Sequence, residues 1–273
     1  MSSIQKIIKY IAIAFALFLA FSIISGIVYG ISSLENLFDN NDNEITRKLK
    51  DLKIDSNASI LNIEVASTNL TIKEGNSLKA ESNNKYIKIK QNQNSLSIIE
   101  KEHNLFSNNK NEELIIYIPS DFSFEYVAIT TGASKLNIDK ISTKNLDLEL
   151  GAGKVDINQL IVLKDTEIEG GAGKITIKDG DIHNLDLEMG IGSLSLTSKL
   201  TGNNHIDAGV GEINLNLLGT MNDYNISLDK GIGSATLAGN SMDDNTQYGT
   251  GSNKIDIDGG VGSISIDFKK NKY

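Results

Sequence analysis

The fold of this chain is decided by residues 146–157, which read Leu-Asp-Leu-Glu-Leu-Gly-Ala-Gly-Lys-Val-Asp-Ile. Apolar and polar residues alternate on both sides of a Gly-x-Gly group, and this alternation is typical of a β-strand with one face in a core and the other in water. The apolar phase slips by one residue at the second glycine, which would turn a straight strand inside out. We therefore predict that the chain bends there, because glycine accepts the backbone angles and the close approach of a corner.

The same group recurs through the second half of the chain. The first glycines follow one another at steps of 20, 19, 19, 22 and 29 residues, and a nearly fixed step of this size is typical of stacked repeats. The predicted corner glycines are Gly151, Gly153, Gly171, Gly173, Gly190, Gly192, Gly209, Gly211, Gly231, Gly233, Gly260 and Gly262. The residues between the paired glycines are predicted to point into the core: Ala152, Ala172, Ile191, Val210, Ile232 and Val261.

These features predict an all-β fold, a parallel β-solenoid whose successive coils lie over one another about 4.8 Å apart. Less regular repeats extend the pattern backwards, first over residues 126–138, where Ser134 replaces the second glycine, and then over residues 63–72, which contain no glycine. Terminal repeats of a stacked array are atypical because they cap the core. We predict one repeat domain, residues 51–273, with capping rungs over 51–130 and regular Gly-x-Gly rungs over 131–268.

A membrane anchor is predicted at the amino terminus. Residues 10–34 carry no charge and are mostly apolar, which is long enough to cross a bilayer as a helix. Lys6 and Lys9 precede this stretch and acidic residues follow it, so the positive-inside rule keeps the amino terminus cytoplasmic. We expect a cytoplasmic stub and transmembrane anchor over 1–34, a linker over 35–50 and an extracellular repeat domain, in a single-pass protein of the cell membrane. A cleaved signal peptide is the alternative, although its apolar region would be shorter than this one.

Charge and cysteine content narrow the possible partners. The formal net charge is -9, and removing the +2 of Lys6 and Lys9 leaves -11 on the remainder. This balance excludes nucleic-acid binding through phosphate neutralisation. The chain has no cysteine, so the strands and the core must hold the domain together without disulfides.

An acidic residue stands two positions before each first glycine, at a position predicted to face outward. The predicted acidic column is Glu149, Glu169, Glu188, Asp207, Asp229 and Asp258. A second row stands two residues earlier and comprises Asp147, Glu167, Asp186, His205, Ser227 and Asp256. Stacked like charges repel each other, so a row of weak sites for calcium or another divalent cation is one interpretation. We favour the other, in which exposed acids keep the domain soluble, because calcium requires about six to eight oxygens and a flat row of carboxylates offers fewer.

The sequence contains no constellation that predicts catalysis. Residues 151–154, Gly-Ala-Gly-Lys, look like part of a phosphate loop, but Val155 replaces the required Ser or Thr. His103, His183 and His205 lie far apart and have no cysteine beside them, which argues against a zinc site. No nucleophile-elbow sequence is present either. We therefore predict a protein that is not an enzyme and has no cofactor.

The chain also resembles a known family. Residues 114–119, Leu-Ile-Ile-Tyr-Ile-Pro, lead into residues 124–134 and then into the strand repeats. This arrangement behind an anchor resembles the bacterial putative-adhesin family of unknown function with β-strand repeats, which includes cell-envelope proteins encoded near stress-response regulators. The resemblance covers residues 50–268 and departs from the family at Ser134 and in the insertion 240–253. It implies a β-solenoid at the cell surface and transfers no functional residues.

Two classes of function remain. The first is a non-catalytic, membrane-anchored surface module, adhesin-like or structural, that binds an unknown envelope or extracellular protein or polymer. The second is a regulatory or sensory membrane protein of the cell-envelope stress response, which would need a partner within the bilayer because the predicted cytoplasmic tail, residues 1–9, is short. An enzyme acting on envelope polysaccharide is a weaker third, since no singular polar cluster stands out.

Overall fold

The computed structural model describes residues 48–54, 58–101, 111–244 and 246–270, all within the unit Asp42–Tyr273. This part of the chain is almost entirely strand, so the predicted all-β class is confirmed. Its one helical segment is a short 3-10 turn, η1 (Met221–Asp223). The strands are β1 (Lys50–Leu52), β2 (Ile60–Val65), β3 (Asn69–Gly75), β4 (Lys79–Ser82), β5 (Ile87–Gln91), β6 (Ser95–Glu100), β7 (Glu113–Pro119), β8 (Phe124–Ile177), β9 (Gly180–His183), β10 (Leu185–Thr201), β11 (Asn203–Leu218), β12 (Tyr224–Asp229), β13 (Ile232–Leu237), β14 (Asn240–Ser241), β15 (Thr246–Tyr248) and β16 (Asn253–Lys269).

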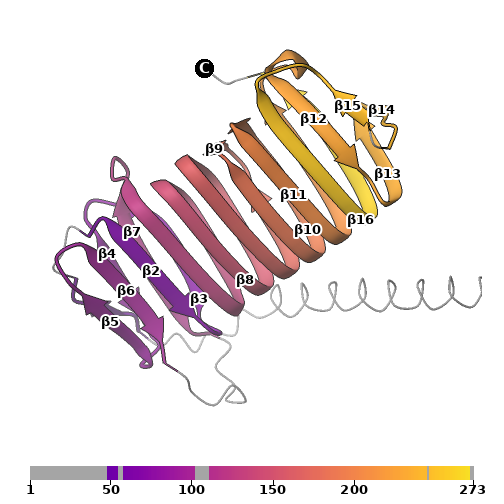
Figure 1. Cartoon of the computed structure of the whole chain (residues 1–273). Coiled ribbons are helices and arrows are strands. Elements are labelled where there is room, and N and C mark those ends of the chain that lie inside the picture. The colour runs from indigo at the N-terminus through magenta and orange to yellow at the C-terminus, as the bar shows by residue number, and fades with distance from the viewer. Residues whose placement is uncertain (1–47, 55–57, 102–110, 245, 271–273) are drawn as a thin grey trace, which may run out of the picture. The chain divides into compact units, whose positions relative to one another are not determined.

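Parallel pairing at a spacing of one repeat organises the centre of the sheet. Strand β10 pairs in parallel with β8 on one side and with β11 on the other, and Leu187 lies opposite both Ile168 and Ile206. Figure 1 shows β8, β10 and β11 winding side by side as successive coils of chain. Because neighbouring coils keep the same register, each apolar position stacks on its equivalent in the next coil.

The core is a set of such stacked apolar rows. Two rows follow the glycine corner, one containing Val155, Ile175 and Leu194 and the other Ile157, Ile177 and Leu196, and all six are buried. A further side of each coil contributes Val162, Ile182 and Leu200, all buried, and here β9 pairs with β8 and β10. The rows consist almost wholly of Ile, Leu and Val, whose branched side chains pack well on a pleated surface.

The order of the strands differs from the order of the sequence at both ends of the sheet. At the amino-terminal end, β2 lies between β6 and β8, and β3 lies between β7 and β8. At the carboxyl-terminal end, β16 lies between β11 on one side and β12 and β13 on the other. The expectation that each coil lies directly on the preceding one is therefore wrong for these segments. Long connections allow the exchange, since 15 residues separate Leu237 from Asn253 in the sequence.

Antiparallel strands cover both ends of the stacked coils. Strands β4 and β5 pair antiparallel with β7 and β6, and β1 pairs with β4. At the other end β14 and β15 pair antiparallel with β13 and β12. These two short strands lie within the insertion 240–253, which the sequence analysis set apart from the repeats. Short covering strands shield the edges of a sheet that would otherwise pair with other chains.

A buried carboxylate fixes the amino-terminal cap. Glu100 Oε2 accepts hydrogen bonds from the backbone N–H groups of Ala66 at 2.7 Å, Ser67 at 3.1 Å and Thr68 at 3.2 Å. Asn84 Nδ2 donates to Oε1 of the same carboxylate at 3.0 Å. Burial acts to raise the pKa of Glu100, but the backbone donors outweigh it and hold the pKa below its ordinary value.

The predicted membrane anchor, residues 10–34, and most of the predicted linker lie outside the described residues. In the part of the chain that the structure describes, no helix is long and apolar enough to cross a membrane. Strand β1 begins at Lys50 and pairs with β4, so the ordered sheet starts at the last residue of the predicted linker.

Candidate binding surface

At the paired glycines, the backbones of neighbouring coils approach each other very closely. A Cβ atom at Gly171 would lie 2.4 Å from the carbonyl oxygen of Gly151, and one at Gly190 would lie 2.6 Å from that of Gly171. The second glycines are tighter still, since a Cβ atom at Gly192 would lie 1.8 Å from the carbonyl oxygen of Gly173. The second glycines also have φ values between +142° and +157°, which side chains rarely adopt. Each corner therefore accepts only glycine because the neighbouring backbone occupies the place of a side chain.

The residues between the paired glycines are less buried than the sequence analysis expected. Ala152, Ala172, Ile191 and Val210 are half-buried, and Ile232 is 74% exposed. Ile191 has Ala172 and Val210 beside it in the neighbouring coils, whereas Ile232 has only Val261 on one side. The prediction of a core position is wrong for Ile232 because its coil ends the stack.

The glycine register aligns the acidic residues into two columns on one face of the sheet. Glu188 lies opposite Glu169 and Asp207, while Asp258 lies opposite Asp207 and Asp229. Because β16 lies between β11 and β12, Asp258 lies between Asp207 and Asp229. The second row aligns in the same way, with Glu167, Asp186, His205 and Asp256 opposite one another in turn. We call the following residues the acidic face: Asp147, Glu149, Glu167, Glu169, Asp186, Glu188, Asp207, Asp229, Asp256 and Asp258.

Few contacts within the chain offset the charge of this face. Tyr126 donates its hydroxyl hydrogen to Asp147 Oδ2 at 3.2 Å, and Thr130 donates to Glu149 Oε2 at 3.3 Å. Among the described residues, no carboxylate of the acidic face lies within 4.0 Å of a Lys, Arg or His nitrogen. The face therefore keeps most of its negative charge available to a partner.

The pKa values of the face reflect this crowding. The pKa of Glu167 is raised first by the charge of Asp147, then by desolvation and by the charges of Glu169 and Asp186. The pKa of Asp258 is raised mainly by burial and then by Asp256, while His205 acts in the opposite direction. Like charges at one strand spacing are thus destabilising, as expected for direct cross-strand neighbours.

Two open grooves cross the acidic face. One groove is lined by Tyr126, Asp147, Glu167, Asp186, His205 and Asp256, together with polar residues of the adjoining turns. The other has carboxylates on one wall, Glu149, Glu169, Glu188 and Asp207, and the corner glycines Gly151, Gly171, Gly190 and Gly209 beside them. These glycines are exposed, so their backbone is accessible to a partner along this second groove.

The described residues of this face form no cluster of metal-ligating side chains. In the described ranges, no group of three or more His, Asp or Glu side chains is placed to hold a metal ion. Calcium requires about six to eight oxygen ligands, more than a single row of carboxylates offers. The cation row from the sequence analysis remains a hypothesis without an assembled site.

Tyr126 joins the surface although the sequence analysis did not single it out. It stands on β8 before the first full Gly-x-Gly repeat, and its hydroxyl reaches Asp147 of the next coil. Burial raises its pKa, and the charge of Asp147 raises it further. The sequence does indicate that Tyr126 points away from the core, because Tyr126, Ala128 and Thr130 alternate with the buried Val127 and Ile129.

Comparison with known proteins gives the family. Residues 50–270 match the model of the Toastrack DUF4097 family. A chain folded as parallel coils with glycine corners, and covered by this match over most of its length, belongs to the Toastrack DUF4097 family. No curated protein matches the chain.

Solved bacterial structures resemble the chain at low identity. A "putative cell adhesion protein" from Clostridium sporogenes is 20% identical, with a TM-score of 0.42, over 82% of this chain and 100% of that one. A "putative adhesin" from Bacteroides fragilis is 16% identical, with a TM-score of 0.31, over 81% and 98% of the two chains. A "putative adhesin" from Parabacteroides merdae is 14% identical, with a TM-score of 0.28, over 80% and 95%.

Proposed function

We propose that this protein is a non-catalytic surface module, anchored in the cell membrane by residues 10–34, whose repeat domain is a β-solenoid with an adhesin-like binding role. The observation that carries the proposal is the acidic face, two aligned columns of carboxylates without ion-pair partners in the described chain. The names of two similar solved proteins, a "putative cell adhesion protein" and a "putative adhesin", agree with this proposal.

The charge of the face selects the chemistry of the partner. Carboxylates repeated at one strand spacing repel anionic polymers and attract a partner that carries several positive groups. The partner we propose is an envelope or extracellular protein or polymer with closely spaced ammonium or guanidinium groups. Opposite charges would steer the partner to the face and make association fast. Binding would also weaken with salt, because exposed charges are screened over about 8–10 Å at physiological ionic strength.

A binding assay tests this proposal. The full chain in detergent is titrated with an oligolysine peptide and, as a probe of opposite charge, with an oligoglutamate peptide of equal length. We expect oligolysine to bind and to be released as salt is raised, and oligoglutamate not to bind. The triple variant Glu167→Gln, Glu169→Gln, Glu188→Gln should lose most of the oligolysine affinity.

A matched variant controls for net charge. Glu74→Gln, Asp121→Asn and Asp267→Asn remove the same charge from exposed positions outside the acidic face. This control should bind oligolysine about as well as the natural chain. If both triple variants lose affinity equally, binding follows net charge and the acidic face is not the site.

A further inference from the structure

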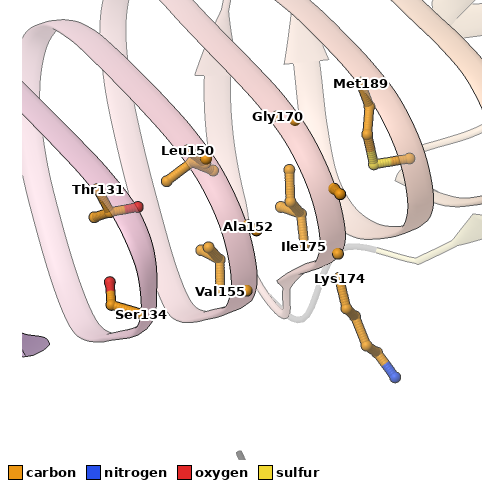
Figure 2. A pocket seen from close by; sticks show the side chains of 14 residues that line it. Thr131, Ser134, Leu150, Ala152, Val155, Gly170, Lys174, Ile175 and Met189 are labelled. Atoms are coloured by element: carbon orange, nitrogen blue, oxygen red, sulfur yellow. The ribbon is translucent and has the colours of Figure 1, made fainter. Parts of the chain in front are cut away.

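A small cavity lies inside the coils beside the glycine corners. It measures about 20 Å³ and is lined at one end by Thr131 and Ser134 and elsewhere by Lys174, glycine backbone and mostly apolar side chains, including Leu150, Val155 and Ile175. Figure 2 shows the hydroxyl groups of Thr131 and Ser134 inside the bend of one coil, with the apolar side chains following along the next coils.

The cavity exists because small residues occupy positions that larger residues fill in other coils. Ala152 and Ala172 stand between the paired glycines, where Ile191 and Val210 stand in the coils that follow. Gly170 takes the position that Met189 occupies in the next coil. The space left by these three smaller residues therefore collects at this part of the corner rather than along the whole core.

The polar end of the cavity contains an unsatisfied group. Ser134 is 3% exposed, and its hydroxyl oxygen has no hydrogen-bond partner among the described residues. Buried hydroxyls without a partner are unfavourable and rare in folded proteins, because they lose the hydrogen bonds that water gave them. Thr131, which is also buried, brings a second hydroxyl to the same end.

We infer that this cavity binds one water molecule, held between the hydroxyl groups of Ser134 and Thr131. A water requires a space of about 10–15 Å³ measured in this way and two to four polar partners, and the cavity of about 20 Å³ meets the first condition with room for a single molecule. The hydroxyls of Ser134 and Thr131 meet the second condition, because they supply two polar partners. The water lies at the Ser134 end because most of the other lining side chains are apolar, and it is held by two hydroxyls of the same coil.

Crystallography of the full chain tests the inference directly. At high resolution we expect an electron-density peak at about 2.6–3.2 Å from Ser134 Oγ, and we expect it to disappear in Ser134→Ala. A cavity without density in the natural chain would overturn the proposal. So would xenon occupying the Ser134 end of the natural chain's cavity under pressure, since xenon enters dry apolar cavities.

A solution measurement provides the second readout. Oxygen-17 magnetic relaxation dispersion counts long-lived internal waters, and we expect Ser134→Ala to have one fewer than the natural chain. Ser193→Ala, at the corner where Ile191 stands, is the matched control and should leave the count unchanged. An equal count in Ser134→Ala and the natural chain would contradict the inference, and near-ultraviolet circular dichroism checks that each variant is folded.

Discussion

Gly192 illustrates how a single residue controls the stacking of coils. Its φ is +150°, and a Cβ atom would lie 1.8 Å from the carbonyl oxygen of Gly173. We predict that Gly192→Ala lowers the free energy of unfolding by at least about 3 kcal/mol, because two backbones must separate and an unfavourable φ must be accepted. Urea unfolding of the full chain, followed by circular dichroism, measures this change.

Gly170 provides the matched control. Its backbone does not require a positive φ, and the nearest atoms to an added Cβ are Cδ1 of Ile175 and Cγ of Met189, at 3.1 and 3.5 Å, both in flexible side chains. We predict that Gly170→Ala leaves stability unchanged or raises it by up to about 1 kcal/mol, because alanine restricts the unfolded chain and fills space in the corner. A loss as large as that of Gly192→Ala would show that the corner tolerates no side chain for another reason.

Glu100 gives the stability of the amino-terminal cap a defined pH dependence. The folded state lowers the pKa of Glu100 below its ordinary value of 4.5. The contribution of Glu100 to the free energy of unfolding is therefore fully present above about pH 4.5 and is lost as the pH falls through the lower folded-state pKa. We predict that Glu100→Gln costs about 2 kcal/mol at neutral pH, because a neutral amide accepts the backbone N–H groups less strongly. The cost should shrink in acid, whereas Glu74→Gln, at an exposed position of β3, should have little effect at any pH.

At the scale of the elements, the sequence predicted the strands and corners better than their order. Alternation and the glycine spacing located the buried rows, such as Leu148, Ile168 and Leu187, since these signals are local. The exchange of β16 with β12 and β13 carries no such signal. Either order would stack the same apolar rows, and the choice depends on the long connection and on the strands β14 and β15 that cover the last coil.

Pairs of engineered cysteines test the strand order, and the chain has no cysteine of its own. Asp207 lies opposite Asp258, while Asp229 lies on the far side of Asp258. We predict that Asp207→Cys with Asp258→Cys forms a disulfide on mild oxidation, because neighbouring strands are about 4.8 Å apart. Asp207→Cys with Asp229→Cys should not, since two strand spacings exceed the reach of a disulfide. Faster crosslinking of the second pair, read by mass spectrometry, would contradict the observed order.

At the scale of the whole molecule, the charge of the acidic face opposes folding. The raised pKa of Glu167 means that stability falls as the pH rises from its ordinary value through the raised one, because the folded state holds its proton more tightly than the unfolded state. We predict that Glu167→Gln raises the Tm by about 1–2 °C at neutral pH and low salt. In about 0.5 M NaCl the difference should largely vanish, as differential scanning calorimetry can measure. An undiminished difference in salt would indicate a packing effect instead.

The candidate surface was partly predictable for the same reason that the coils were. A fixed period turns a repeated Glu or Asp into a column, so Glu149, Glu169 and Glu188 could be aligned from spacing alone. The place of Asp258 beside Asp207 required the strand order, and the unsatisfied hydroxyl of Ser134 required the packing of the chain around the corner. Periodicity thus predicts what repeats, whereas features made by departures from the repeat depend on the folded structure.

The insertion of β16 has a consequence for how the protein is made. Translation delivers β12 and β13 before β16, yet β16 lies between them and β11. Until it arrives, the outer edge of β11 and the inner edges of β12 and β13 have no neighbour, and such bare edges invite aggregation and proteolysis. A nascent or truncated copy therefore exposes strand edges that β16 covers in the finished protein.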